Sequence, residues 1–296
     1  MHDGLVTSRA LHDPNAELVP GSLVGERYVV ESVIGHGTTS IVYRARALEG
    51  GGAVALKVLR ASLARGTISA TRLEREAEIV ARLDHPSIVR LFATGWIETG
   101  QIWIALELLE GETLEALLQR EAPLGLERTV RLLDDVLAGL GAAHDAQILH
   151  RDLKPANLVV VRDASGDERA KLLDFGVGRD LRDTGPRLTA PQALVGTLAY
   201  LAPEQLTPGM DPDARADLWA LAVVAYRALT GRAPFGLRGA RMVATIVRSD
   251  PSSPSALVPA LGASVDAFFA RALAKDRDAR WQTAHAMRDA LRALVR

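Results

Sequence analysis

The 296 residues carry 35 Lys and Arg against 36 Asp and Glu, a net charge of −1, which disfavours a nucleic-acid binder held by nonspecific attraction to phosphate. The absence of cysteine excludes disulfides, thiol nucleophiles and cysteine-based zinc sites, and it favours a reducing compartment, so we expect a cytoplasmic protein. Residues 1–25 have no signal-peptide or anchor pattern and are expected to form a flexible tail.

Strands dominate the first part of the chain. Residues 27–37, 40–47 and 51–60 alternate in polarity or are rich in β-branched side chains, which predicts three strands. In the segment 72–83, Leu73, Ala77, Val80 and Leu83 fall on one helical face, which predicts a helix. Residues 87–98 and 101–109 then predict a hairpin around Thr99 and Gly100, completing a mostly antiparallel sheet of about five strands.

Helices dominate the rest of the chain. From Leu126 onward, apolar residues recur at spacings of three and four, which predicts a long amphipathic helix that ends near His144. The apolar stretch 218–226 is far shorter than the roughly 20 residues that cross a bilayer, so it predicts a buried helix and no membrane segment. The fold class is therefore α+β, with a sheet-rich lobe over 26–109, a helical lobe over 110–296, and a ligand cleft expected at their junction.

Two features of the first lobe indicate a site for an anion. Gly35 and Gly37 separate two predicted strands and would let backbone amides approach a phosphate, although a plain hairpin turn explains them about equally well. Lys57 lies among apolar residues of a predicted strand and needs an anionic partner, for which Glu76 is the best candidate by position. Taken singly, Lys57 could instead be an edge-strand charge and Glu76 an exposed helix carboxylate.

The string HRDLKPAN at residues 150–157 gathers chemistry in a loop that Pro155 is expected to keep from becoming helix. Asp152 could accept a proton from a hydroxyl, and Lys154 could neutralise charge on a transferring group. Asn157 and Asp174, the first residue of the DFG string, offer oxygen ligands to a hard cation. The alternative is a capped, hydrogen-bonded turn with no chemical role.

Together these motifs resemble the eukaryotic-type (Hanks-type) serine/threonine protein kinases, and the match runs in order from Gly35 to Arg280 in a style similar to bacterial members. The resemblance implies one catalytic domain over 26–296 with a bilobal protein-kinase fold: a small antiparallel sheet lobe with one main helix, and a larger, mostly helical lobe. It also implies transfer of the γ-phosphoryl group of ATP, with Mg²⁺ or Mn²⁺, to serine and threonine hydroxyls of protein substrates. The kinase itself is one expected substrate, through autophosphorylation.

The resemblance also assigns roles to residues. Lys57 would bind the α- and β-phosphates and pair with Glu76, Asp152 would orient the substrate hydroxyl with Lys154 beside it, and Asn157 and Asp174 would hold magnesium. The backbone of Glu107 and Leu109 would contact adenine, with Leu106 behind it. Further nucleotide contacts would come from Gly35, His36, Gly37, Thr38, Ser40, Val42 and Ala55, where Ser40 departs from the third glycine of many members.

Regulation and structural support are also implied. Arg151 is expected to be a buried guanidinium satisfied by a phosphate on Thr189 or Thr184. Glu204 would pair with Arg280, and Asp217 would anchor the backbone of the 150–157 loop.

Two other functions remain open: a pseudokinase that acts as a scaffold, and a kinase for small molecules. The complete set of Lys57, Asp152, Asn157 and Asp174 disfavours the first. The segment GTLAYLAPEQ, which resembles a peptide-substrate segment, disfavours the second.

Overall fold

A computed structural model describes residues 17–63, 66–175, 198–236 and 240–296. The chain divides into two compact units: the first contains residues 1–82 and 90–109, and the second contains residues 83–89 and 110–296.

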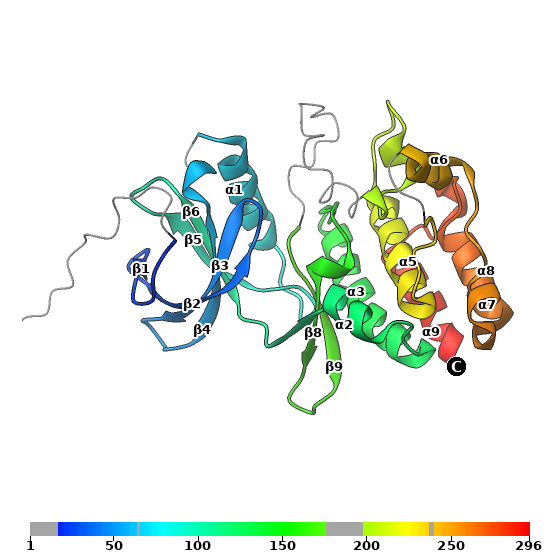
Figure 1. Ribbon diagram of the computed structural model, residues 1–296, viewed down its shortest axis with the longest axis horizontal. Helices are drawn as coiled ribbons and strands as arrows, with labels where there is room; N and C mark the ends of the chain where they lie inside the picture. Colours follow the sequence, from blue (N-terminus) through cyan, green and yellow to red (C-terminus); the bar gives the residue numbers. More distant parts are fainter. Residues whose placement is uncertain (1–16, 64–65, 176–197, 237–239) are drawn as a thin grey trace, which may run out of the picture. The chain divides into compact units, whose positions relative to one another are not determined.

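The first unit is built on a six-stranded antiparallel sheet in the order β1-β2-β3-β4-β6-β5 (Figure 1). Its strands are β1 (Leu23–Val24), β2 (Tyr28–His36), β3 (Ser40–Ala47), β4 (Ala53–Leu59), β5 (Leu91–Trp96) and β6 (Ile102–Glu107). The hairpin predicted around Thr99 and Gly100 is therefore confirmed, and the sheet has one strand more than expected.

The additional strand, β1, lies inside the segment that was expected to be a flexible tail. Val24 is fully buried and pairs with Tyr28, whose ring meets Trp103 edge to face at 5.5 Å. A tight turn at Gly25, where φ is +59°, brings the backbone so close that a Cβ atom would lie 2.3 Å from the Trp103 ring. Burial of this apolar cluster orders the chain from residue 17 onward, so the tail prediction is wrong for residues 17–25.

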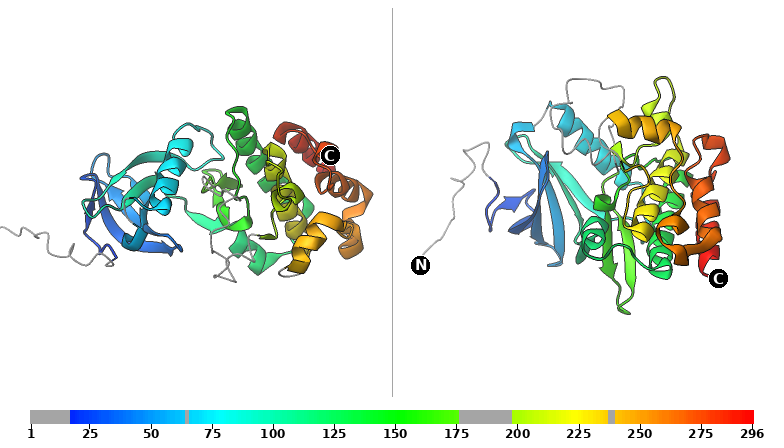
Figure 2. Two further views of the ribbon diagram at one scale, coloured as in Figure 1. Left: turned by 90° about the horizontal axis from the view of Figure 1, so that it is seen from above. Right: turned by 45° about the vertical axis from the view of Figure 1, so that its right-hand side comes forward.

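One helix, α1 (Ile68–Val80), packs on the sheet of the first unit (Figure 2). It begins four residues earlier than predicted because the Thr67 hydroxyl accepts the Ala70 amide as an N-cap. Leu73, Ala77 and Val80 are buried as predicted, whereas Leu83 lies beyond the helix.

The second unit combines a three-stranded sheet with a group of helices. The strands are β7 (Gly111–Thr113), β8 (Leu158–Arg162) and β9 (Glu168–Leu172). The helices are α2 (Leu114–Glu121), α3 (Leu126–Asp145), α5 (Ala214–Thr230), α6 (Ala240–Arg248), α7 (Pro254–Leu257), α8 (Gly262–Ala272) and α9 (Ala284–Arg292). The predicted α+β class and the long helix ending near His144 are confirmed.

Helix α5 is the core of the second unit. Every residue from Ala216 to Tyr226 is buried, including Asp217. The helix packs against α3 and α8, between which it lies in Figure 1. This burial explains why residues 218–226 are apolar on every side of the helix rather than on one stripe. Among the described residues, no helix combines the length and apolarity that a membrane crossing requires.

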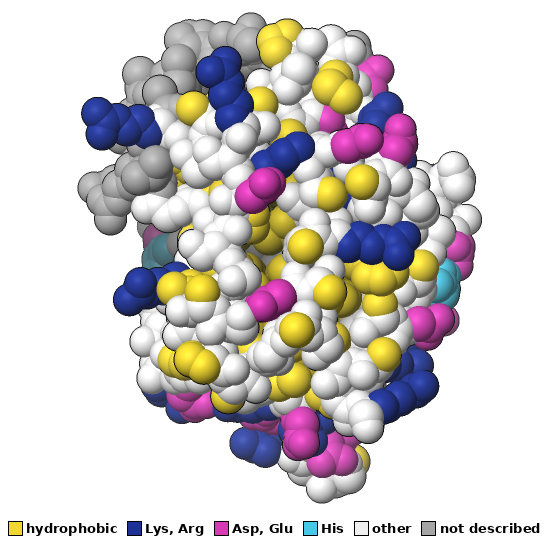
Figure 3. Space-filling view, turned by 90° about the vertical axis from the view of Figure 1, so that its right-hand side faces the viewer, with side chains coloured by type: hydrophobic (Ala, Val, Ile, Leu, Met, Phe, Trp, Pro, Cys, Tyr) yellow, Lys and Arg dark blue, Asp and Glu magenta, His cyan; other side chains and the backbone are white. Residues whose placement is uncertain are grey.

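The surface seen in Figure 3 carries basic and acidic side chains interspersed with hydrophobic ones. This mixture agrees with the near-equal numbers of basic and acidic residues in the sequence.

Candidate active site

In the first unit, Lys57 of β4 pairs with Glu76 of α1. The Lys57 Nζ atom donates to Glu76 Oε1 at 2.8 Å, and the two side chains are only 13% and 17% exposed. The neighbours Leu56 and Val58 are buried on the opposite face of β4, so strand alternation directs Lys57 away from them. The partner predicted for Lys57 is therefore present, and the ammonium is fixed in a partly desolvated position.

The sheet register gathers other predicted nucleotide contacts around Lys57. Val42 of β3 lies opposite Lys57, and Ala55, two residues before Lys57 on β4, lies opposite Leu106 of β6. Residues directly opposite each other in a ladder share a face, so all four side chains lie on one face of the sheet. Each of them is half-buried, which leaves this face partly open.

The glycine-containing segment is a turn between β2 and β3. The Gly37 amide donates to the Ser40 carbonyl at 2.8 Å, and the Arg60 guanidinium donates to the Gly37 carbonyl from two nitrogens at 3.2 Å. His36, Gly37 and Thr38 are exposed and Ser40 is buried. The segment around Gly35 and Gly37 therefore forms a hairpin turn, one of the two interpretations of these glycines. The tip of the turn is exposed, so a ligand can reach it.

The predicted adenine contacts lie where the chain of the first unit ends. Glu107 is the last residue of β6, and its amide donates to the Arg90 carbonyl at 2.8 Å. Leu109 is the final residue of this unit.

In the second unit, Asp217 of α5 holds the backbone of the 150–157 loop. Its Oδ2 accepts the His150 amide and its Oδ1 accepts the Arg151 amide, both at 2.8 Å, and His144 Nε2 lies 2.9 Å from Oδ2. Burial alone would raise the pKa of Asp217, but the hydrogen bonds with His144 and with the His150 amide lower it below the ordinary value. Asp217 therefore stays ionised and fixes the loop as predicted.

Arg151 differs from the expectation of a buried guanidinium. Its side chain is exposed, and only its amide points to Asp217. The residue has φ of +63°, a left-handed conformation that is uncommon for a side-chain-bearing residue. The prediction of burial is wrong because the loop turns at Arg151 to satisfy the Asp217 carboxylate with backbone rather than with the guanidinium.

The reactive groups of the loop converge on Asp152. Lys154 Nζ donates to Asp152 Oδ2 at 2.7 Å, and Asn157 Nδ2 donates to the Asp152 carbonyl at 2.8 Å and to Oδ2 at 3.2 Å. Pro155 begins a short 3₁₀ helix, Pro155–Asn157, instead of excluding helical structure, because the first helical position needs no amide donor. The carboxylate is thus oriented by a cation and an amide.

His150 ties this loop to the DFG string. It is fully buried, its Nε2 donates to the Leu173 carbonyl at 2.9 Å, and its ring lies 4.8 Å from that of Phe175. Burial lowers the pKa of His150, so the ring is neutral at physiological pH. Sequence reasoning missed the roles of His150 and His144, because nothing in their neighbourhood distinguishes them from ordinary core histidines.

Asn157 and Asp174 fit the requirements of a hard divalent cation. The Leu173 amide donates to the Asn157 carbonyl at 2.9 Å, which joins the backbone just before Asp174 to Asn157. Because the Asn157 side-chain nitrogen faces Asp152, its amide oxygen is directed elsewhere. One carboxylate and one amide oxygen match Mg²⁺, which binds few protein ligands and takes the rest from phosphates and water.

The two predicted phosphorylation sites, Thr184 and Thr189, lie outside the described residues, so the structure does not bear on them.

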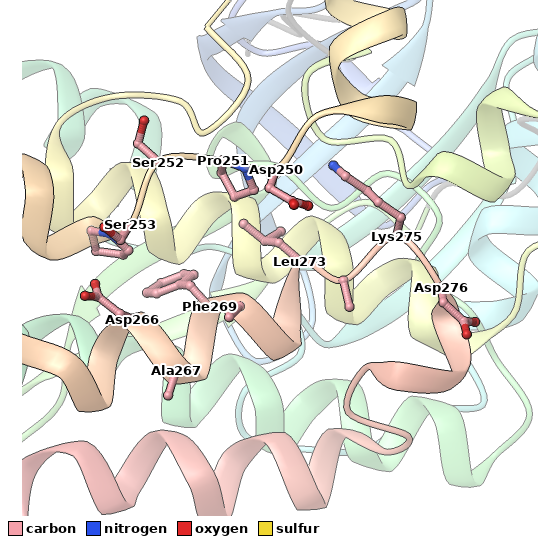
Figure 4. A pocket seen from close by; sticks show the side chains of 13 residues that line it. Asp250, Pro251, Ser252, Ser253, Asp266, Ala267, Phe269, Leu273, Lys275 and Asp276 are labelled. Atoms are coloured by element: carbon pink, nitrogen blue, oxygen red, sulfur yellow. The ribbon is translucent and has the colours of Figure 1, made fainter.

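A cavity of about 600 Å³ elsewhere in the second unit contains none of these groups. It lies between α8 and the loop before α7, and Figure 4 shows Phe269 and Leu273 projecting toward Pro251 and Ser252. Its size matches small-molecule sites. However, its lining holds neither the loop carboxylates nor Lys57, so it is not assigned to phosphoryl transfer.

Comparisons with known proteins agree with the motifs. A family model described as "Protein kinase domain" matches residues 28–291. Serine/threonine-protein kinase PknJ of Mycobacterium tuberculosis is 41% identical over 271 residues, which are 90% of this chain and 45% of that protein. Serine/threonine-protein kinase PknB of the same species is 39% identical, over 90% of this chain and 42% of that protein. The chain therefore spans less than half the length of these curated relatives.

The fold also matches a solved structure. The PknI kinase domain of Mycobacterium tuberculosis superposes with a TM-score of 0.72 at 30% identity, covering 94% of this chain and all of that one.

Proposed function

The chain belongs to the protein kinase family, with the bilobal protein-kinase fold, and on this premise we propose that it transfers the γ-phosphoryl group of ATP to serine and threonine hydroxyls of proteins. The observation that carries the proposal is the loop at residues 150–157. There the buried Asp217 of α5 fixes the backbone, while Lys154 and Asn157 orient Asp152.

Asp152 is the proposed acceptor of the hydroxyl proton. As the substrate oxygen forms its bond to the γ-phosphorus and the bond from that phosphorus to the β–γ bridging oxygen breaks, the hydroxyl proton moves to the Asp152 carboxylate. The Asn157 amide holds this carboxylate in one orientation. Lys154, already 2.7 Å from Asp152, supplies positive charge beside the transferring group.

Lys57 is the proposed phosphate ligand. Glu76 fixes its ammonium at 2.8 Å, so the cation is held in place before the nucleotide binds. Asn157 and Asp174 would hold Mg²⁺, or Mn²⁺, which when bound neutralises charge on the phosphate oxygens. The half-buried Val42, Ala55 and Leu106 provide an apolar face for the adenine.

Autophosphorylation, its acceptor residue and the cellular compartment remain proposals, which rest on the resemblance and on composition. We propose that the kinase phosphorylates itself, with Thr189 or Thr184 as the acceptor. The cysteine-free composition supports a cytoplasmic catalytic domain.

The test is transfer of label from [γ-³²P]ATP to a generic basic protein in the presence of Mg²⁺. We expect transfer by the wild type and a loss of several orders of magnitude in Asp174→Ala, with circular dichroism showing that the variant is folded. Retained turnover in Asp174→Ala would refute the assigned role. Nucleotide binding by a folded wild type without any transfer would favour a pseudokinase scaffold, and transfer only to small molecules would favour the other alternative.

A further inference from the structure

Arg60 has no role in the chemistry described so far, yet it holds the turn between β2 and β3 at two points. Nε and Nη2 of its guanidinium both donate to the Gly37 carbonyl at 3.2 Å. Its own amide donates to the Thr39 carbonyl at 2.9 Å. The residue that follows β4 therefore fixes the backbone of the turn with its side chain and with its main chain.

The Gly37 carbonyl belongs to the same peptide group as the Thr38 amide. This peptide bond is trans, so its C=O and N–H bonds point in opposite directions, and a guanidinium that holds the carbonyl also fixes the direction of the amide. Thr38 is exposed, and its amide donates to no group among the residues that the structure describes. The turn thus presents one oriented hydrogen-bond donor to a ligand.

Arg60 reaches the turn from the face of the sheet opposite to Lys57. It comes three positions after Lys57, an odd number, so strand alternation directs the two side chains to opposite faces. Tyr43 follows Val42, which lies opposite Lys57 in the ladder, so Tyr43 also faces away from Lys57. Burial raises the pKa of Tyr43, and the charge of Arg60 opposes this rise, which agrees with a guanidinium on that face. The Thr38 amide, directed away from Arg60, therefore points to the Lys57 side.

We propose that Arg60 positions the phosphate-binding turn: by holding the Gly37 carbonyl, it keeps the Thr38 amide directed at the phosphates of ATP, and so sets the affinity for the phosphates but not for adenosine. This inference rests on the ATP binding of the proposed function. Arg60 is a positioning residue, because it acts through the turn from the opposite face of the sheet.

Loss of the Arg60 side chain should affect the order of the turn more than the stability of the fold. Both of its hydrogen bonds are exposed, so water competes with them and their net contribution to stability is small. Glycine at position 37 leaves the peptide free to rotate once its carbonyl is released. ATP must then order the turn as it binds, and this ordering lowers its affinity.

The experiment measures binding of ATP and of adenosine, each with Mg²⁺, by isothermal titration calorimetry. Arg60→Met should raise Kd for ATP about tenfold, the equivalent of one hydrogen bond to a charged group, and leave Kd for adenosine unchanged. Arg60→Lys keeps the charge but offers one donor in place of a planar pair, so it should raise Kd for ATP about threefold. The matched control is Arg27→Met, which removes an exposed arginine at the other end of β2 and should change neither Kd.

An unchanged Kd for ATP in Arg60→Met would overturn the proposal and leave the proposed function standing, as would equal losses for ATP and adenosine. Wild-type affinity in Arg60→Lys beside a weakened Arg60→Met would also overturn it, because the charge alone would then suffice. If Arg60→Met fails to fold, Arg60→Lys decides, and an unchanged Kd for ATP there contradicts the proposal. A folded wild type that binds no ATP would remove the proposed function and this inference with it.

Discussion

Replacing Asp217 by asparagine tests how far the catalytic loop depends on α5. The carboxylate accepts the amides of His150 and Arg151, one on each oxygen. Asparagine has a single side-chain oxygen, so one of the two amides must face an NH₂ group and lose its partner. An unpaired buried donor costs about 1–3 kcal/mol, and we expect the free energy of unfolding to fall by roughly 2 kcal/mol.

The effect on catalysis should exceed the effect on stability. Arg151, with φ of +63°, is held in a conformation of higher energy, and losing its amide partner lets the backbone beside Asp152 relax. A shift of about 1 Å in a catalytic group costs roughly 10²-fold in rate, so kcat should fall by about that factor.

The assay combines urea unfolding, followed by circular dichroism, with steady-state kinetics. Asp213→Asn is the control: Asp213 caps the same helix by accepting the Arg215 amide, but it does not touch the loop. It should lower stability by up to about 1 kcal/mol and leave kcat unchanged. Wild-type kcat in Asp217→Asn would refute the reasoning.

Three other variants test separate parts of the molecule. Lys57→Met should lower phosphoryl transfer by several orders of magnitude with little change in the unfolding midpoint, which radiolabel transfer and thermal denaturation measure together; near-normal transfer would exclude Lys57 from the chemistry. Glu204→Gln leaves the fully buried Arg280 without its counter-charge and should cost about 3–5 kcal/mol in urea unfolding, whereas a loss below 1 kcal/mol would show the pair to be dispensable. Burial lowers the pKa of Lys275 from 10.5 to about 8, so the unfolded chain binds more protons between those values and stability should rise with pH across this range. Lys275→Met should lack that part of the rise, and identical pH profiles of the two proteins would contradict it.

Much of the fold could be predicted because local patterns and packing agree. The spacing of apolar residues in α3 predicts a helix with one buried face. The apolar run of α5 predicts a helix buried on all sides, because such a helix must be enclosed by other elements. β1 could not be predicted, because two residues carry no alternation. Its order comes from Val24 and Gly25 packing into a cluster with Trp103, which is distant in sequence.

In the candidate site, too, some features could be predicted from the sequence and others could not. The Lys57–Glu76 pair follows from a charge that needs a partner, whereas the resemblance alone implied the anchoring by Asp217; both are present. The exposure of Arg151 and the contribution of His150 could not be predicted, because both depend on the path of the backbone within the loop. The contact between Arg60 and the Gly37 carbonyl joins two separate stretches of chain, and no sequence spacing indicates it.

The most direct test of the proposed phosphoryl transfer is intact-mass spectrometry of the wild type and of Asp152→Asn after incubation with Mg-ATP and a generic basic protein. The wild type should add phosphate to the protein substrate, and Asp152→Asn, folded to the same extent, should add none over the same interval. Phosphate added by Asp152→Asn at the wild-type rate, or none added by a folded wild type that binds ATP, would contradict the account.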